Sequence, residues 1–255
     1  MKVSFIGSGN VATHLAYAFH GLNYSIAQVY SPKLQNAQLL AQEVQAQAIT
    51  DIAELDVADI YFIAVKDSAI ATVAAQLADL NIQGIVVHTS GSTDINALAT
   101  ASPYYGVFYP LQTFSKNQPL DFKNIPLLLE ANDQSTLQQL DQLARGLSQQ
   151  VYHYSSAQRR SLHLAAVLAC NFSNYLYSLA DQYLNEQGVD FNLLKPLILE
   201  TAHKSQNNAP VHVQTGPAVR HDQTILDMHM QMLNDQPQLQ QIYQLLSSGI
   251  MQLHS

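Results

Sequence analysis

Three small residues near the start of the chain, spaced as Gly7-x-Gly9-x-x-Ala12, have the types and spacing that phosphate binding requires. Gly7 permits a tight turn, Gly9 lets the backbone approach a pyrophosphate, and Ala12 keeps a helix close to the preceding strand. The first N–H groups of that helix have no partner and favour an anion. The alternative is a glycine-rich turn that binds nothing. We predict that the motif binds a dinucleotide through Gly7, Ser8, Gly9, Asn10, Val11 and Ala12.

The end of the second predicted strand bears on which dinucleotide binds. NAD-binding proteins usually carry an acid about 20 residues beyond the glycines, where it contacts the ribose 2′-hydroxyl. Here the strand ends in Ser31 and Lys33, and the first acid after the motif is Glu43. A hydroxyl and an ammonium suit a 2′-phosphate, so we predict NADP(H). Alternatively, Lys33 only solvates the start of its helix.

A reaction at a nicotinamide needs a proton donor or acceptor beside the substrate heteroatom. His163 is the first candidate, because histidine can titrate near neutral pH. Helical spacing of three to four residues aligns His163, Val167 and Asn171 on one stripe, where the Asn171 amide could orient a carbonyl or imine. The alternative is that His163 is an internal histidine bonded to a backbone carbonyl.

Residues that follow two apolar strands are further candidates, since open α/β sheets bind ligands beyond the carboxyl ends of their strands. Ser90 comes shortly after His88 and is expected to line the nicotinamide or the substrate; a plain turn is the alternative. The backbone of Ala64, Val65 and Lys66 is expected to contact the cofactor ribose.

Charged residues in the last third of the chain suggest one more contact. The Arg220 guanidinium suits a substrate carboxylate; the alternative is that Arg220 and Asp222 simply pair with each other. Asp222 could also cap the helix that carries His229. His212, His221 and His229 lack an acid–histidine motif, and we predict no metal site.

The pattern of elements predicts an α/β fold, with a Rossmann-type doubly wound parallel sheet followed by an all-α region. We place the domains at residues 1–155, which bind NADP(H), and 156–255, which are helical. Strands are expected at residues 2–6, 25–31, 48–50, 59–65, 84–88, 105–109, 125–130 and 150–154. Helices are expected at residues 10–20, 34–47, 67–80, 134–147, 157–187, 192–206, 223–233 and 237–253, with a loop at 209–217.

Composition excludes several classes of protein. The net charge of −8 argues against a nucleic-acid partner, because phosphate binding needs a basic surface. With 47% hydrophobic residues a sizeable core can form, yet no apolar run reaches the length of a membrane span. A single cysteine is typical of a cytoplasmic protein and allows no intrachain disulfide.

Beyond these patterns, the glycine motif with Ser31 resembles the pyrroline-5-carboxylate reductases and the deazaflavin-dependent NADP oxidoreductases. Four further segments together resemble a bacterial family of NADP-dependent oxidoreductases that joins a Rossmann-like domain to a helical domain of unknown function. These segments are His88–Gly91, Tyr109–Phe114, Leu162–Leu164 with Asn171-Phe172, and Gln214–Pro217 with Arg220 and Asp222. The resemblance implies a 6-phosphogluconate-dehydrogenase-like helical domain, a type commonly used for dimerisation, and hence a homodimer.

Two departures from related families limit what the resemblance implies. Many β-hydroxyacid dehydrogenases carry a lysine four residues before the helical asparagine, where this chain has Val167. Prephenate dehydrogenases carry a histidine where this chain has Tyr109. Neither substrate class is therefore implied. We expect NADPH-dependent reduction of a small carbonyl or imine, with or without a carboxylate; the alternative is a non-catalytic NADP(H)-binding redox sensor.

Overall fold

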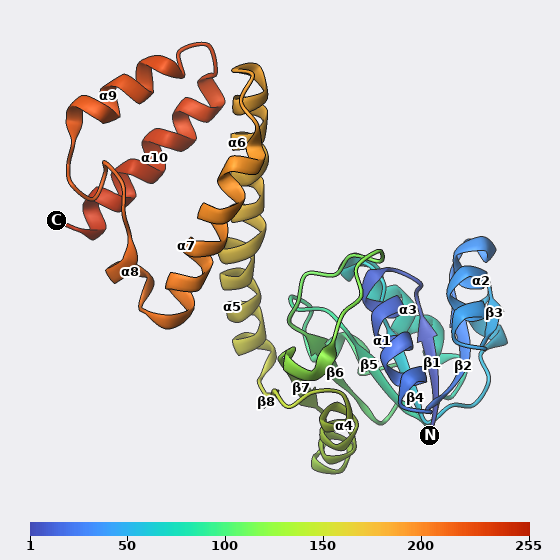
Figure 1. Ribbon diagram of the computed structural model, residues 1–255. Helices are drawn as coiled ribbons and strands as arrows, with labels where there is room; N and C mark the ends of the chain where they lie inside the picture. Colours follow the sequence, from blue (N-terminus) through green and yellow to red (C-terminus); the bar gives the residue numbers. More distant parts are fainter. The chain divides into compact units, whose positions relative to one another are not determined.

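The computed structural model describes residues 1–255 and divides into two compact units, Met1–Val167 and Leu168–Ser255 (Figure 1). The first unit contains the whole sheet, and the second contains only helices. None of the helices combines the length and the hydrophobicity that a membrane crossing requires.

Eight strands form one sheet with the order β3-β2-β1-β4-β5-β6-β7-β8. Neighbouring strands are parallel except for β6 and β7, which are antiparallel. Strand order reverses beside β1, where doubly wound sheets bind their ligands. The strands are β1 (Lys2–Ile6), β2 (Ser25–Tyr30), β3 (Gln47–Ile49), β4 (Ile60–Ile63), β5 (Ile85–His88), β6 (Tyr105–Pro110), β7 (Leu127–Ala131) and β8 (Val151–His153).

Helices connect these strands and then form the second unit (Figure 1). The α-helices of the first unit are α1 (Asn10–Gly21), α2 (Leu34–Glu43), α3 (Ile70–Ala78), α4 (Gln134–Leu147) and α5 (Ser156–Ala166). Those of the second are α6 (Ser173–Glu186), α7 (Lys195–Asn207), α8 (Pro210–Val213), α9 (Gln223–Met232) and α10 (Pro237–Leu253). Short 3₁₀ turns lie at Ile52–Glu54, Asp67–Ala69, Ile95–Leu98, Phe122–Asn124 and Phe191–Leu194.

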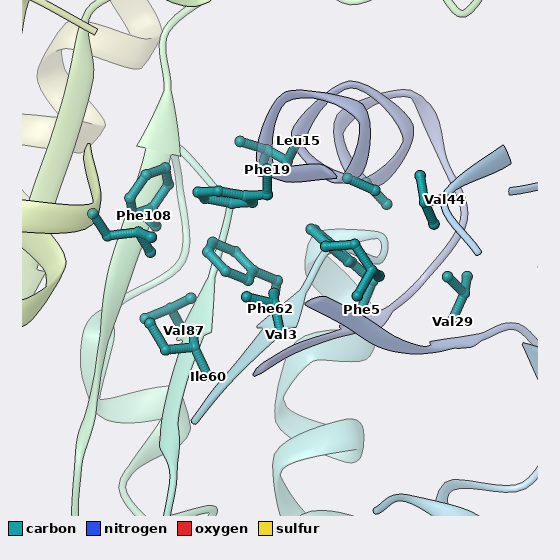
Figure 2. Close-up of a cluster of buried hydrophobic side chains, with 14 of the residues drawn as sticks. Val3, Phe5, Leu15, Phe19, Val29, Val44, Ile60, Phe62, Val87 and Phe108 are labelled. Atoms are coloured by element: carbon teal, nitrogen blue, oxygen red, sulfur yellow. The ribbon is translucent and has the colours of Figure 1, made fainter. Parts of the chain in front are cut away.

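The core of the first unit lies on both faces of the sheet. Along β1, Val3 and Phe5 pack into the cluster that includes α1, α2 and α4, whereas Ile6 packs into the cluster that includes α3. Figure 2 shows the first cluster, in which Phe5 stacks on Phe62 with ring centroids 5.2 Å apart. This packing holds the start of α1 at the carboxyl end of β1.

The predicted fold class is confirmed, and every strand lies within two residues of its predicted bounds. Two helical expectations were wrong. Residues 157–187 are not one α-helix, because Val167–Phe172 form a π-helix between α5 and α6. The predicted loop at 209–217 contains the short helix α8, since a proline at the first helical position starts a turn instead of breaking one.

Candidate functional site

The turn after β1 has a backbone that only glycine adopts readily. Gly7 has φ +122°, and its N–H donates to the Tyr30 carbonyl at 2.9 Å. A Cβ on Gly7 would lie 2.2 Å from the Ala64 carbonyl oxygen. The first glycine of the motif is therefore needed both for its conformation and for its close approach to the chain that leaves β4.

The start of α1 fits a phosphate group. Gly9 is the N-cap, no side chain caps the helix, and the first turn contains no acid. A Cβ built on Gly9 would meet no atom within 4 Å, so the space above the turn is open. Ala12 is fully buried against the sheet. The start of α1 therefore suits a pyrophosphate cradle made of backbone N–H groups, and the predicted contacts of these residues with the cofactor stay predictions.

Ser31 and Lys33 lie between β2 and α2. Ser31 is buried, and its N–H donates to the Ile49 carbonyl at 3.2 Å. Lys33 is exposed and occupies the N-cap position of α2, where no side chain caps the helix. The positive end of a helix dipole and an ammonium lie together here, and both favour an anion.

Tyr109 and His163 form a hydrogen-bonded pair in the first unit. The Tyr109 Oη and His163 Nδ1 atoms lie 3.0 Å apart, and the two rings meet edge to face. Tyr109 belongs to β6 and His163 to α5, so the pair joins two elements that are far apart in the sequence. A phenol bonded to an imidazole can donate a proton and be reprotonated by its partner.

Gly91 packs directly against this pair. A Cβ on Gly91 would lie 2.6 Å from His163 Nδ1 and 2.8 Å from Tyr109 Cζ. Gly91 follows β5, so the pair lies beside the chain that leaves the carboxyl end of that strand. Only a residue without a side chain leaves room for both rings in their observed positions.

The environment keeps the Tyr109 phenol protonated. Burial raises the pKa of Tyr109 above its ordinary value of 10.0, and the Asp67 carboxylate raises it further. Asp67 also accepts a hydrogen bond from the Ser92 hydroxyl at 2.5 Å. Around neutral pH the phenol is therefore a proton donor.

Arg159 anchors the start of α5 to the rest of the first unit. Its guanidinium is fully buried and bonds the Glu130 carboxylate and the Thr93 carbonyl, each at 2.5 Å. Ser156 completes the network by donating to Glu130 at 2.7 Å. Removing one partner of such a buried ion pair strongly lowers the free energy of unfolding. The network therefore holds the helix that carries His163 in place.

Ser90 is held by hydrogen bonds within its own turn. The Ser90 hydroxyl oxygen accepts hydrogen bonds from the Ser92 and Thr93 N–H groups at 3.1 and 3.0 Å. The N–H of Ser90 itself donates to His88 Nδ1 at 3.1 Å. These bonds fit the turn that was the alternative for Ser90, whose predicted contact with nicotinamide or substrate stays a prediction.

The other predicted contacts are distributed over both units. Ala64 donates its N–H to the Ile6 carbonyl at 2.9 Å, which brings the chain that contains Ala64, Val65 and Lys66 beside the glycine turn. Asn171 and Arg220 belong to the second unit and are exposed there. The π-helix at Val167–Phe172 also interrupts the spacing on which the predicted stripe depended. Their roles stay predictions.

Asp222 does not pair with Arg220. It caps α9 instead, accepting a hydrogen bond from the Ile225 N–H at 3.3 Å. The predicted cap is confirmed, and none of the ion pairs of the chain involves Arg220. No three side chains of His, Cys, Asp or Glu gather as metal ligands do.

Sequence reasoning gave no role to Tyr109 or Arg159. The Tyr109 segment contributes to the family resemblance and departs there from a histidine, but its partner lies 54 positions away and no local pattern links the two. Arg159 stands in a polar stretch that reads as an exposed helix face. The local sequence indicates only where its helix begins, through the capping box of Ser155 and Gln158 at the start of α5.

Two family descriptions match the chain. Residues 2–91 match the family described as "NADP oxidoreductase coenzyme F420-dependent", and residues 125–250 match a domain of unknown function, DUF2520. Among curated proteins, none matches. A provisionally named NADP oxidoreductase from Bacteroides fragilis is 42% identical over 98% of both chains, with a TM-score of 0.93. This chain belongs to the NADP oxidoreductase family.

More distant solved structures share only the fold. A pyrroline-5-carboxylate reductase from Coxiella burnetii is 16% identical over 99% of this chain and 98% of its own, with a TM-score of 0.58. A reductive aminase from Aspergillus terreus, whose structure contains NADPH, is 15% identical over 98% of this chain and 92% of its own, with a TM-score of 0.70. The predicted family resemblance is confirmed.

Family membership also settles the cofactor and the class of activity. This NADP oxidoreductase is an enzyme that uses NADP(H), and the alternative of a non-catalytic sensor is not favoured. Its residues fit the cofactor: the glycine turn is open above Gly9, and an ammonium follows β2 at Lys33 where an acid would repel a 2′-phosphate.

Proposed function

We propose that this NADP oxidoreductase reduces a small carbonyl or imine compound, with the Tyr109–His163 pair as the source of the proton. The observation that carries the proposal is the 3.0 Å approach of Tyr109 Oη to His163 Nδ1 beside Gly91. Tyr109 is the second-last residue of β6, and Gly91, which follows the carboxyl end of β5, packs against the pair. Such strand ends are where open α/β sheets bind ligands.

The cofactor, when bound, supplies a hydride to the substrate carbon. The chain must then supply one proton to the oxygen or nitrogen that leaves the double bond. Tyr109 donates this proton as its O–H bond breaks, and the proton on His163 Nδ1 passes to the phenolic oxygen. His163 is only partly buried and regains its proton from water. One hydride and one proton are added, so the product is an alcohol or an amine.

Tyr109 suits the role of donor better than a carboxylic acid would. Burial raises the pKa of Tyr109, so the phenol is protonated around neutral pH, where an ordinary carboxylic acid is ionised. His163 lowers the energy of the developing phenolate by donating from Nδ1. Positioned acids of this kind typically contribute about 10²- to 10⁴-fold to the rate.

A second copy of the chain is the proposed partner of the helical unit. Helices α6, α7 and α10 bury none of their own residues in the single chain. Large apolar side chains of this unit are exposed to solvent, for example Leu193 (71% exposed), Leu197 (62%) and Leu245 (74%). Exposed apolar surface of this kind usually marks an interface. A homodimer accounts for it.

Turnover by the purified protein tests the proposal. NADPH oxidation is followed in a panel of 2-keto acids, aldehydes, ketones and cyclic imines at neutral pH. The proposal expects at least one carbonyl or imine to be reduced, with one NADPH consumed per product. NADPH binding without turnover across the whole panel, including single-turnover conditions, would contradict it.

A further inference from the structure

The loop between β6 and β7 crosses back over the glycine turn. Three side-chain contacts fix it there: Asn10 Nδ2 donates to the Phe114 carbonyl at 2.8 Å, His14 Nε2 bonds the Ser115 carbonyl at 2.9 Å, and Lys116 Nζ donates to the Ser8 carbonyl at 2.8 Å. Each contact joins residues more than 100 positions apart. The loop is therefore held by the phosphate-binding segment itself.

The contact of Lys116 brings an ammonium to the glycine turn. Ser8 stands between Gly7 and Gly9, so its carbonyl lies within the predicted pyrophosphate cradle. A lysine ammonium has three donors, and the Ser8 carbonyl uses one of them. Two N–H donors remain for phosphate oxygens, and Lys116 is exposed.

The cations of the first unit fall into two groups. All three arginines are paired with carboxylates: Arg145 with Asp141, Arg159 with Glu130, and Arg160 with Asp94. The lysines of the unit take part in no ion pair, and Lys116 is the one whose ammonium bonds the glycine turn. The whole chain carries a net charge of −8, which opposes the approach of an anionic dinucleotide. A free cation at the cradle offsets that repulsion locally.

Two residues of α1 hold the loop at this position. Asn10 and His14 are four positions apart, so they lie on the same face of the helix. The His14 ring also packs against Phe114, with centroids 5.5 Å apart. Because both contacts come from the first turns of α1, the position of Lys116 is tied to the helix whose N-terminus faces the pyrophosphate.

We infer that Lys116 is a ligand of the pyrophosphate of bound NADP(H), reaching it from the β6–β7 loop. This inference rests on the proposed cofactor site at the glycine turn. Lys116 and Lys33 then have separate tasks. The pyrophosphate is common to NADPH and NADH, whereas only NADPH carries the 2′-phosphate that Lys33 is expected to contact.

Calorimetric titration of four proteins with NADPH and with NADH tests the inference. Wild type is compared with Lys116→Gln, Lys33→Gln and Lys123→Gln, the last being an exposed lysine on the 3₁₀ turn Phe122–Asn124, with no assigned role. Lys116→Gln is expected to weaken both dinucleotides by about 10-fold or more, the usual effect of a lost charge-assisted hydrogen bond. Lys33→Gln should weaken NADPH only, and Lys123→Gln neither.

A further variant, Lys116→Arg, should restore most of the affinity, because arginine also donates to phosphate. The difference between wild type and Lys116→Gln should shrink as salt rises, since salt screens exposed charges. Unchanged affinity of Lys116→Gln for both dinucleotides would overturn the inference, and so would a loss confined to NADPH. If wild type binds neither dinucleotide, the proposed cofactor site itself fails, which is a separate and recognisable result.

Discussion

The Tyr109 hydroxyl lies 3.0 Å from His163 Nδ1, and this bond joins strand β6 to helix α5. The two residues lie 54 positions apart in the sequence, and the segment between them contains β7, α4 and β8. Gly91 lies beside them, with no room for a Cβ between its backbone and the two rings. The pair therefore depends on three separate segments of the chain, and each segment can be perturbed on its own.

Adding one methyl group at Gly91 should break the pair. A Cβ there would lie 2.6 Å from His163 Nδ1, so the imidazole must move. We expect Gly91→Ala to lower kcat by about 100-fold and the free energy of unfolding by about 1–3 kcal/mol, typical of overpacking. The affinity for NADPH should change little. Steady-state kinetics and denaturant unfolding measure the two effects.

Two other glycines provide matched controls. Gly249→Ala, within α10, meets no atom within 4 Å and should leave kcat and NADPH affinity unchanged. Because alanine favours a helix more than glycine does, this variant should raise the free energy of unfolding by about 0.5–1 kcal/mol. Gly9→Ala also meets no protein atom, but its methyl group would stand where the pyrophosphate is expected. That variant should stay folded and lose NADPH affinity. Normal turnover by Gly91→Ala would show that the observed pair is not needed.

The choice of cofactor should depend on Lys33. Replacing it with glutamine removes the ammonium beside the start of α2 and leaves the glycine turn intact. We expect NADPH to bind about 10- to 100-fold more weakly to Lys33→Gln, with NADH unaffected. Calorimetry with both dinucleotides measures the ratio of the NADPH and NADH dissociation constants. If this ratio is the same in Lys33→Gln as in wild type, Lys33 only solvates the start of its helix.

His88 should make the fold sensitive to acid. It is fully buried, and burial together with the Arg159 guanidinium lowers its pKa from 6.5 to about 4. Below pH 6.5 the unfolded chain binds a proton at this residue, and the folded chain does not until the pH nears 4. The contribution of neutral His88 to the free energy of unfolding is thus fully present above pH 6.5. As the pH falls from 6.5 to about 4, up to about 3 kcal/mol of this free energy is lost.

Urea unfolding across that window tests the effect, with His88→Asn as the comparison. Asparagine keeps an acceptor for the Ser90 N–H and cannot bind the proton. The variant should therefore lose less stability than wild type between pH 6.5 and 4. Equal losses in the two proteins would mean that other groups cause the acid sensitivity.

The sequence predicted the sheet well because its signals are local. The Gly7-x-Gly9-x-x-Ala12 motif and the short apolar runs each describe a few adjacent residues, and hydrophobic alternation along β1 assigns Val3 and Ile6 to opposite faces. The π-helix at Val167–Phe172 has no comparable signal. Apolar periodicity continues through it, so one long α-helix was expected.

The site was only partly predictable, because its contacts are made across the sequence. His163 was chosen for its chemistry, but its partner Tyr109 is set by the order of strands in the sheet. Lys116 stands in a loop whose composition suggests only solvent exposure. Its position depends on the contacts that Asn10 and His14 make with the carbonyls of Phe114 and Ser115.

The apolar surface of the helical unit should hold two copies together. Leu197 lies on α7 and is 62% exposed. A carboxylate there would be costly to bury, so Leu197→Glu should shift a dimer to monomers. Light scattering after size-exclusion chromatography measures the mass. Glu200→Gln, on the same helix and half exposed at its side chain, is the control. A wild-type monomer would contradict the proposed homodimer.

Single-turnover reduction by the Tyr109→Phe variant tests the central claim most directly. The substrate is whichever carbonyl or imine the wild type reduces, and NADPH is pre-bound at saturation. Phenylalanine keeps the ring beside Gly91 and removes only the hydroxyl that meets His163. The account predicts unchanged NADPH affinity and a rate at least about 100-fold lower, with His163→Gln also slow. Reduction by Tyr109→Phe at the wild-type rate would contradict it.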